Sequence, residues 1–159
     1  MNVMIRKAVL ADNEKIRPMQ AEIAKLHYEG KPELFKPEPR YYTNEDFAKM
    51  LADPERYVFV AEEDGGRIVG YAFAYIIHVR RHPTYIDFDR FYIDDICVLE
   101  ECRGRGIGKR LFAACREAAA QTDCKTMELG VFGFNRGAIA FYEACGMTEQ
   151  QRRMEIVLR

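Results

Sequence analysis

The sequence has no tryptophan, only three histidines and no C-x-x-C pair. Its cysteines are odd in number: Cys97, Cys102, Cys115, Cys124 and Cys145. An odd count without paired spacing argues against a disulfide framework and against a structural zinc site. This cysteine usage is typical of a reducing compartment. We therefore expect a cytoplasmic protein that holds no metal.

Long apolar runs and an excess of one charge are also missing. The longest apolar run, Ile68–Ile77, is about half of the ~20 residues needed to cross a bilayer. Met1–Leu10 lacks the apolar core of a secretory signal. The 24 basic and 25 acidic residues nearly cancel, which argues against a sequence-independent nucleic-acid binder. We expect neither a membrane nor a nucleic acid as partner.

The remaining composition, 48% hydrophobic and 31% charged, is that of an ordinary globular protein. We expect a single domain over residues 1–159. Apolar periodicity predicts strands at Val3–Val9, Tyr57–Glu62, Ile68–Val79, Phe91–Leu99, Thr126–Phe132 and Met154–Leu158. It predicts helices from Asp12 to Leu26, from Thr43 to Leu51, over Ile107–Gln121 and over Gly137–Cys145. The order indicates an α/β (α+β) fold, with a mixed, mostly antiparallel central sheet and helices on both faces.

Local signals refine these boundaries. Asp12 is a suitable N-cap for the first helix, and Pro18 should kink or split that helix. Thr43, followed three residues later by Asp46, resembles a capping box. Asp64–Gly65–Gly66 predicts a tight hairpin, and Gly146 stands where a helix C-cap glycine belongs. The segments His27–Tyr42 and Arg80–Arg90 read as loops.

The most informative segment is the glycine-rich turn Arg103–Lys109, which joins a predicted strand to a predicted helix. Its alternating glycines allow close approach of a ligand to the backbone, and a helix N-terminus attracts phosphate. A dinucleotide fold would require G-x-G-x-x-G early in the chain. A Walker A loop would require Ser or Thr where Arg110 stands. A turn without a ligand is the remaining alternative.

Two motifs carry a family resemblance. Arg103-x-x-Gly106-x-Gly108 resembles the R/Q-x-x-G-x-G/A signature of the GNAT superfamily of acetyl-CoA-dependent N-acetyltransferases. The second block resembles the N-x-x-A-x-x-F-Y-x-x-x-G-F ending of that family, in the form Asn135-x-x-Ala138-x-x-Phe141-Tyr142-x-x-x-Gly146-Met147. The resemblance covers nearly the whole chain and is weakest in the two loops. It implies the GNAT fold.

The resemblance also implies how acetyl-CoA binds. Its pyrophosphate would be held by the turn residues Arg103, Gly104, Arg105, Gly106, Ile107, Gly108 and Lys109. A splay between two strands would admit the pantetheine arm, which would pair with the main chain of Ile96, Cys97 and Val98 like an added strand. Asn135 and Ala138 would contact the same arm. As an alternative, Asn135 is simply a helix N-cap.

For catalysis, the resemblance implies that Tyr142 protonates the departing thiolate, although a buried structural tyrosine is the alternative. The attacking amine needs a proton acceptor, and Asp94 and Asp95 are the candidates. Strand alternation predicts that they point to opposite faces. Asp94 is the first choice, acting through water, with Asp95 second. Alternatively, one of them pairs with Arg80, Arg81 or Arg90.

The acceptor amine is not specified by these motifs. The acids of the two loops, Asp87, Asp89, Glu29 and Glu33, mildly favour a cationic acceptor: a polyamine, a drug-like amine or a protein amino group. His27 could line the acceptor pocket, although a packed histidine is the plainer interpretation. An acyl-enzyme on Cys97 is less favoured than direct transfer in a ternary complex. Alternative functions are an inactive coenzyme A-binding regulator and a nucleotide-binding enzyme. A homodimer is compatible with the family.

Overall fold

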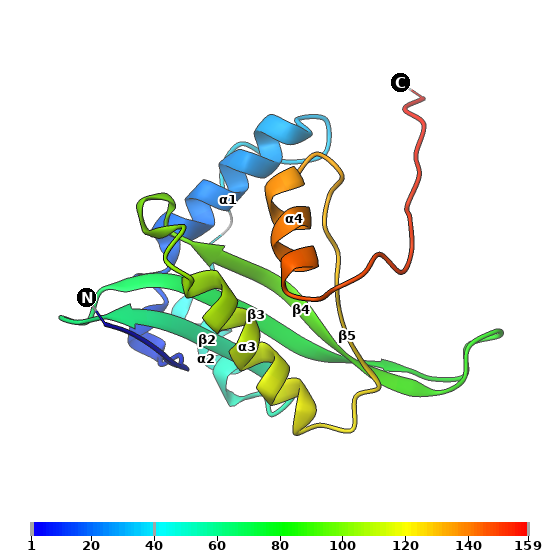
Figure 1. The fold of residues 1–159 in the computed structure, drawn as a ribbon, viewed down its shortest axis with the longest axis horizontal. Coiled ribbons are helices and arrows are strands. Elements are labelled where there is room, and N and C mark those ends of the chain that lie inside the picture. The colour runs from blue at the N-terminus through cyan, green and yellow to red at the C-terminus, as the bar shows by residue number, and fades with distance from the viewer. Residues whose placement is uncertain (1, 40, 159) are drawn as a thin grey trace.

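A computed structural model describes residues 2–39 and 41–158. One sheet of five strands runs through it in the order β1-β2-β3-β4-β5 (Figure 1). The strands are β1 (Val3–Lys7), β2 (Arg56–Glu63), β3 (Ile68–Val79), β4 (Phe88–Val98) and β5 (Thr126–Leu129). Neighbours are antiparallel except β4 and β5, which are parallel. The predicted mixed, mostly antiparallel sheet is therefore confirmed.

Helices cover both faces of this sheet, as predicted. The α-helices are α1 (Arg17–Gly30), α2 (Asn44–Ala52), α3 (Ile107–Ala120) and α4 (Arg136–Ala144), with short 3-10 helices η1 (Leu10–Asp12) and η2 (Glu100–Cys102). In Figure 1, α3 crosses in front of the sheet and α2 lies behind it. The buried residues of α3 are Ile107, Leu111, Phe112 and Cys115, a single stripe at helical spacing. This stripe packs against β2, β3 and β4.

The first helix differs from the prediction at both ends. Asp12 does not cap it: the buried Asp12 carboxylate binds the Arg6 guanidinium through bonds of 2.7 and 3.0 Å and accepts from Val9 N at 2.9 Å. The α-helix starts five residues later, so Pro18 lies in its first turn. Proline is tolerated there because the first N–H groups have no intrahelical acceptor. The predicted helical segment is thus split just ahead of Pro18, and α1 continues through His27 to Gly30.

The other turn and cap signals are confirmed. Thr43 Oγ1 accepts from Asp46 N at 3.1 Å at the start of α2. Gly65 and Gly66 both have positive φ in the β2–β3 hairpin. Gly146 ends α4 with φ 92°, and the following Met147 N donates to Tyr142 O at 3.0 Å. Local sequence chemistry fixes these points because each depends on one side chain or one backbone angle.

A β-bulge interrupts β4 at Asp94. Phe73 of β3 pairs with Asp95, whereas the next residue, Ala74, pairs with Ile93, which leaves Asp94 without a partner on β3. The parallel ladder between β4 and β5 ends at the same level, with the pair Ile93 and Leu129. Beyond it, β4 continues to Val98 while β5 has ended. The predicted splay between these strands is thus present, and the bulge marks its start.

The C-terminal strand prediction is wrong. Residues 148–158 form no helix or strand, and Figure 1 shows this segment leaving the body of the molecule. Met154, Ile156 and Leu158 are more than 80% exposed. Their alternation suits a strand, but no strand within the described residues pairs with them, and a strand needs a partner. The expectation of a homodimer stays a prediction.

Two smaller boundaries also differ. β4 starts at Phe88 inside the predicted loop, and β5 ends at Leu129 rather than Phe132. Among the described residues, no helix combines the length and the apolar character that a membrane crossing requires.

Candidate active site

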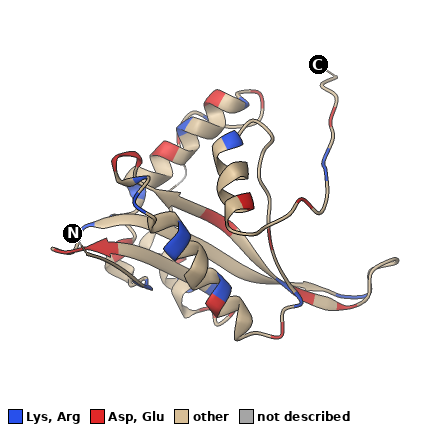
Figure 2. Cartoon of the chain, viewed as in Figure 1, with Lys and Arg blue, Asp and Glu red and all other residues tan. Residues whose placement is uncertain are grey.

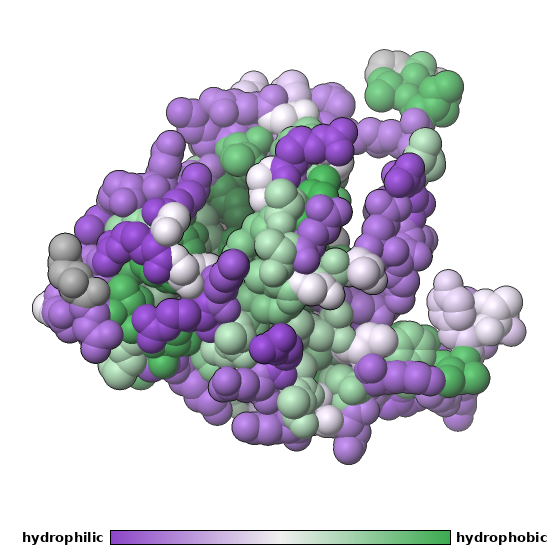
Figure 3. Space-filling model, in the orientation of Figure 1, coloured by the Kyte–Doolittle hydropathy of each residue, from purple (hydrophilic) through white to green (hydrophobic). Residues whose placement is uncertain are grey.

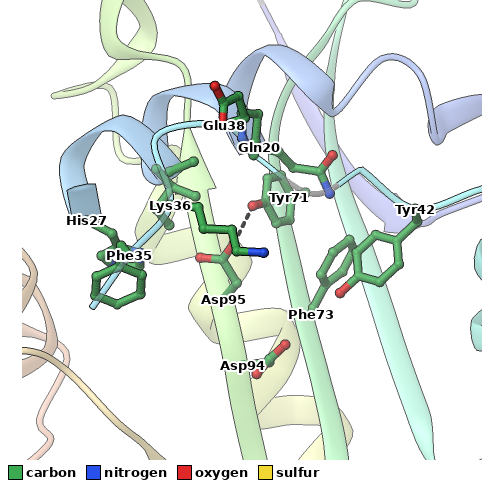
Figure 4. A pocket seen from close by; sticks show the side chains of 13 residues that line it. Gln20, His27, Phe35, Lys36, Glu38, Tyr42, Tyr71, Phe73, Asp94 and Asp95 are labelled. Atoms are coloured by element: carbon green, nitrogen blue, oxygen red, sulfur yellow. Dashed lines mark hydrogen bonds between the residues drawn. The ribbon is translucent and has the colours of Figure 1, made fainter. Parts of the chain in front are cut away.

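A cavity of about 310 Å³ opens between α1, the loop after it and the bulged part of the sheet (Figure 4). This volume is at the lower end of the range for small-molecule sites. Its walls are lined by Gln20, Ile23, Ala24, His27, Phe35, Lys36, Glu38, Pro39, Tyr42, Tyr71, Phe73, Asp94 and Asp95. The lining combines aromatic rings with charged groups of both signs. Such a mixture suits a small polar ligand with an aliphatic portion.

Asp94 and Asp95 both line this cavity. The expectation that they point to opposite faces is therefore wrong. Strict alternation holds only in an uninterrupted strand, and the bulge at Asp94 inserts one extra residue into β4. The bulge thus brings two neighbouring carboxylates into one cavity.

Neither aspartate forms an ion pair with an arginine in the described part of the chain. Arg80 instead binds Asp89 at 2.5 Å, and Arg90 binds Glu128 at 3.1 Å. Asp95 accepts a hydrogen bond from the hydroxyl of Tyr71, drawn as the dashed line in Figure 4. The alternative of an arginine partner for these acids is contradicted.

Burial raises the pKa of Asp95 to about 7, and the negative charge of Asp94 acts in the same direction. The hydrogen bond from Tyr71 opposes this shift because it stabilises the carboxylate. Burial also raises the pKa of Asp94, which stays exposed at the cavity rim. A carboxyl group that titrates near neutral pH can both accept and release a proton there.

Several lining residues were not predicted from the sequence. Tyr71 and Tyr75 are the two hydroxyl-bearing residues in the apolar run of β3. A hydroxyl group in such a run is a signal that could have marked Tyr71 as a candidate site residue. Lys36 and Glu38 lie in the loop that follows α1. A loop has no sequence periodicity from which the direction of its side chains could be predicted. His27 does line the cavity, and burial lowers its pKa.

The acids that favoured a cationic acceptor lie elsewhere. Asp89 is bound to His78 and Arg80, and Asp87 accepts from Arg81 N at 2.8 Å. Glu29 faces Lys25 across one helical turn at 3.8 Å, and Glu33 does not line the cavity. The acids that do line it are Glu38, Asp94 and Asp95.

The glycine-rich turn has the backbone of an anion site. Gly104 and Gly106 have φ values of 77° and 78°, and Gly106 is the N-cap of α3. None of the six successive N–H groups from Gly104 to Lys109 makes a hydrogen bond of normal geometry to an acceptor in the described part of the chain. A Cβ added at Gly104 or Gly106 would meet open space. These amides and this space fit a phosphate group.

The arginines of this turn are held by acids. Arg103 binds Glu22 of α1 at 2.9 Å, and Arg105 binds the buried Glu63 of β2 at 2.7 Å. Figure 2 marks the acidic residues of η2 directly beside this basic loop. The ion pairs fix the turn to α1 and to the sheet, which leaves its backbone as the surface available to an anion.

An apolar hollow lies between α1 and α4 in Figure 3, on the side where β4 has left β5. The edge of β4 at Ile96, Cys97 and Val98 belongs to this splayed region. Val98 O accepts from Arg103 Nε at 3.0 Å, which leaves the second lone pair of this carbonyl for a ligand. Asn135 Oδ1 accepts from Ala138 N at 3.1 Å, which is the N-cap arrangement.

Tyr142 lies on α4, outside the cavity lining, and its ring packs against Phe112 and Phe141. Burial raises the pKa of Tyr142, and the charge of Asp95 raises it further. Its hydroxyl makes no hydrogen bond to a described residue. A phenol that stays protonated and unpaired is suited to donate a proton.

Cys97 is buried, and its thiol points at Met19 O at 3.6 Å. Burial raises the pKa of Cys97 to about 12. The thiolate needed for an acyl-cysteine is therefore disfavoured at neutral pH. Within residues 2–39 and 41–158, no group of three or more histidine, cysteine or acidic side chains could hold a metal ion.

Known proteins share both the sequence pattern and the fold. An L-ornithine N5-acetyltransferase of Arabidopsis thaliana is 29% identical over 60% of this chain and 41% of its own length. A thialysine N-epsilon-acetyltransferase of Sus scrofa is 28% identical over 91% of this chain and 84% of its own. The chain spans about half the length of several curated relatives that it matches.

Among solved structures, the BH1408 protein of Bacillus halodurans superimposes with a TM-score of 0.91 and 27% identity. The superposition covers 98% of this chain and 99% of that one. The model of the acetyltransferase (GNAT) family matches residues 21–147, which include the bulge, the glycine-rich turn and Tyr142. The chain therefore belongs to the GNAT family of acetyltransferases.

Proposed function

We propose that the protein transfers the acetyl group of acetyl-CoA to the primary amine of a small cationic acceptor, by direct attack in a ternary complex. The observation that carries this proposal is the bulge at Asp94. It turns two carboxylates into one cavity, next to the splayed edge of β4. The six unpaired amides of the glycine-rich turn support a diphosphate as the anchor of the acetyl donor.

The residues divide the chemistry as follows. The acidic lining draws an ammonium group into the cavity, and Asp95 takes the proton that the amine must lose. We prefer Asp95 to Asp94 because the pKa of Asp95 is close to neutral pH and Tyr71 holds its carboxylate in place. Tyr142 donates its proton to the departing thiolate. Asp94 keeps the cavity negative and holds the acceptor.

The cavity composition also favours a class of acceptor. Three acids against one lysine suit a compound with a net positive charge, and the volume suits a molecule the size of an amino acid or a short diamine. The named relatives act on ornithine and thialysine, which carry a side-chain amine. We therefore expect diamino acids and short diamines to be better acceptors than aminoglycosides or protein amino groups.

A panel of amines tests this proposal, with release of free thiol from acetyl-CoA as the readout. Ornithine, lysine, 1,4-diaminobutane, an aminoglycoside and a peptide N-terminus span the acceptor classes. We expect thiol release in equal amount to acetylated amine, fastest with the first three. Binding of acetyl-CoA without thiol release would instead support an inactive regulator. Tighter binding of ADP than of coenzyme A would support a nucleotide-binding enzyme.

A further inference from the structure

A lysine of the chain itself points into the cavity. Figure 4 shows the side chain of Lys36 directed inward, toward the side of Asp95. Lys36 lines the same walls as Asp94 and Asp95. Its amino group forms no hydrogen bond or ion pair with any other residue that the structure describes. A primary amine of the chain itself therefore borders the space proposed for the acceptor.

Lys36 is exposed, and the loop places it at the mouth of the cavity. The ring of Phe35, one residue earlier, stacks on His27 of α1 with 4.7 Å between centroids. Phe35 N also donates to Lys31 O at 3.1 Å. Pro37 follows directly and restricts the backbone on the other side. Lys36 is thus fixed between an anchored aromatic residue and a proline.

Other lysines lack this setting. Lys49 pairs with Glu45 at 2.7 Å along α2, and Lys25 faces Glu29 at 3.8 Å along α1. Both side chains are well exposed, and neither lines the cavity. Lys25 and Lys49 therefore serve as controls for acetylation that depends only on the exposure of a lysine.

Asp95 connects Lys36 to the proposed acid. It faces the cavity that Lys36 enters, and its charge is felt at the hydroxyl of Tyr142. An amine beside Asp95 is therefore next to the proposed proton acceptor, and the charge of that acceptor raises the pKa of the proposed donor, Tyr142. An acceptor amine must lie close to both Asp95 and Tyr142 for the proposed reaction to occur.

We infer that Lys36 is an internal acceptor, and that the protein acetylates Nζ of its own Lys36 when no other amine fills the cavity. The inference rests on the proposed function. The ammonium first loses one proton through Asp95 to solvent. Nζ then attacks the thioester carbonyl: an N–C bond forms, the C–S bond breaks, and the second proton ends on the sulfur of free coenzyme A. The product is a neutral acetamide on Lys36.

The test is incubation of the intact protein with acetyl-CoA alone, followed by mass spectrometry of the whole chain and of its peptides. We expect one acetyl group per chain, on Lys36, introduced at least tenfold faster than on Lys25 or Lys49. The rate constant should be independent of protein concentration, because the reaction occurs within one chain. Excess coenzyme A and 1,4-diaminobutane should both slow it.

Three controls make the result decisive. Lys36→Arg keeps the charge and should abolish the fast labelling, whereas Lys49→Arg should not change it. Protein unfolded in urea should label all three lysines equally slowly. Equal rates at these lysines in the folded protein, or no effect of coenzyme A, would overturn the inference. If the amine panel is acetylated while Lys36 is not, only the inference fails; if nothing is acetylated, the proposed function fails with it.

Discussion

The hydroxyl of Tyr71 on β3 donates a hydrogen bond to Asp95 Oδ2 on β4. The two residues are diagonal neighbours, since Tyr71 pairs with Cys97 and Phe73 pairs with Asp95. Side chains two residues apart in a strand share a face, so Tyr71, Phe73 and Asp95 meet at one wall of the cavity. This contact holds the pKa of Asp95 below the value that burial alone would give.

Tyr71→Phe should therefore change the pH dependence of activity. Loss of the hydroxyl removes the hydrogen bond that stabilises the Asp95 carboxylate, so the pKa of Asp95 should rise above about 7. If ionised Asp95 accepts the proton, kcat/KM rises with pH through this pKa. In the variant, the rise of kcat/KM with pH should therefore occur at higher pH. Tyr57→Phe, in β2 and outside the cavity, is the control and should leave this rise where it is.

Asp95→Asn should lower the activity and raise the stability of the protein above neutral pH. The pKa of Asp95 is raised in the folded protein, so the folded state binds its proton more tightly and loses stability as pH rises from about 4 to about 7. The neutral amide removes this loss. Thermal unfolding should show a higher Tm for the variant at pH 8 and little difference at pH 4. A gain of 1 kcal/mol corresponds to roughly 2–4 °C for a domain of this size.

The exposed neighbour supplies the comparison for that experiment. Asp94→Asn should raise Tm at pH 8 less than Asp95→Asn does, because Asp94 keeps more of its contact with water. An equal or larger gain from Asp94→Asn would contradict the assignment of the larger pKa shift to Asp95, the less exposed of the two acids.

Tyr142→Phe should lower kcat by roughly tenfold to a thousandfold, because the phenol is the proposed donor to the thiolate. The ring, which packs against Phe112 and Phe141, is retained in phenylalanine. Acetyl-CoA affinity, measured by calorimetry, should therefore stay close to that of the parent. An unchanged kcat removes the acid role from Tyr142.

Gly106→Ala should weaken coenzyme A binding. Gly106 has φ 78° at the start of α3, a region that costs a non-glycine residue roughly 1–2 kcal/mol. The new methyl group would also enter the space beside the unpaired amides, which no protein atom within 4 Å fills. We expect both a lower Tm and a loss of affinity for coenzyme A.

Gly65→Ala separates these two effects. Gly65 has φ 94° in the β2–β3 hairpin and also has no protein atom within 4 Å of an added Cβ. The substitution should lower Tm by a similar amount while leaving coenzyme A affinity intact. A matching loss of affinity in both variants would mean that backbone strain, rather than the phosphate site, explains the result. Gly108 is unsuitable here because a Cβ would come within 3.2 Å of Phe141.

Features that depend on a few adjacent residues could be predicted from the sequence. The glycine-rich turn between strand and helix, the Thr43 cap, the two-glycine hairpin and the Gly146 C-cap each follow from one backbone angle or one side chain. The continuous apolar run of β3 and the helical apolar period of α3 likewise predict buried elements.

Features that depend on distant partners could not be predicted. Asp12 is an acceptable helix cap in isolation, but Arg6 from β1 offers a bidentate ion pair and the helix starts later. Met154–Leu158 has the alternation of a strand, yet a strand exists only where another strand meets it. In both cases the sequence pattern is compatible with the predicted element, but whether that element forms depends on a contact with a residue far away in the sequence.

The candidate site divides in the same way. The residue types were determined by the sequence: a glycine-rich turn, a tyrosine on the last helix and two adjacent acids on the strand before the turn. Only the tertiary structure decided that both acids face one cavity, because a bulge is a mismatch in length between two paired strands and is invisible in either strand alone. The position of Lys36 is of the same kind, since a loop without periodicity takes its direction from the ring of His27 against which Phe35 stacks.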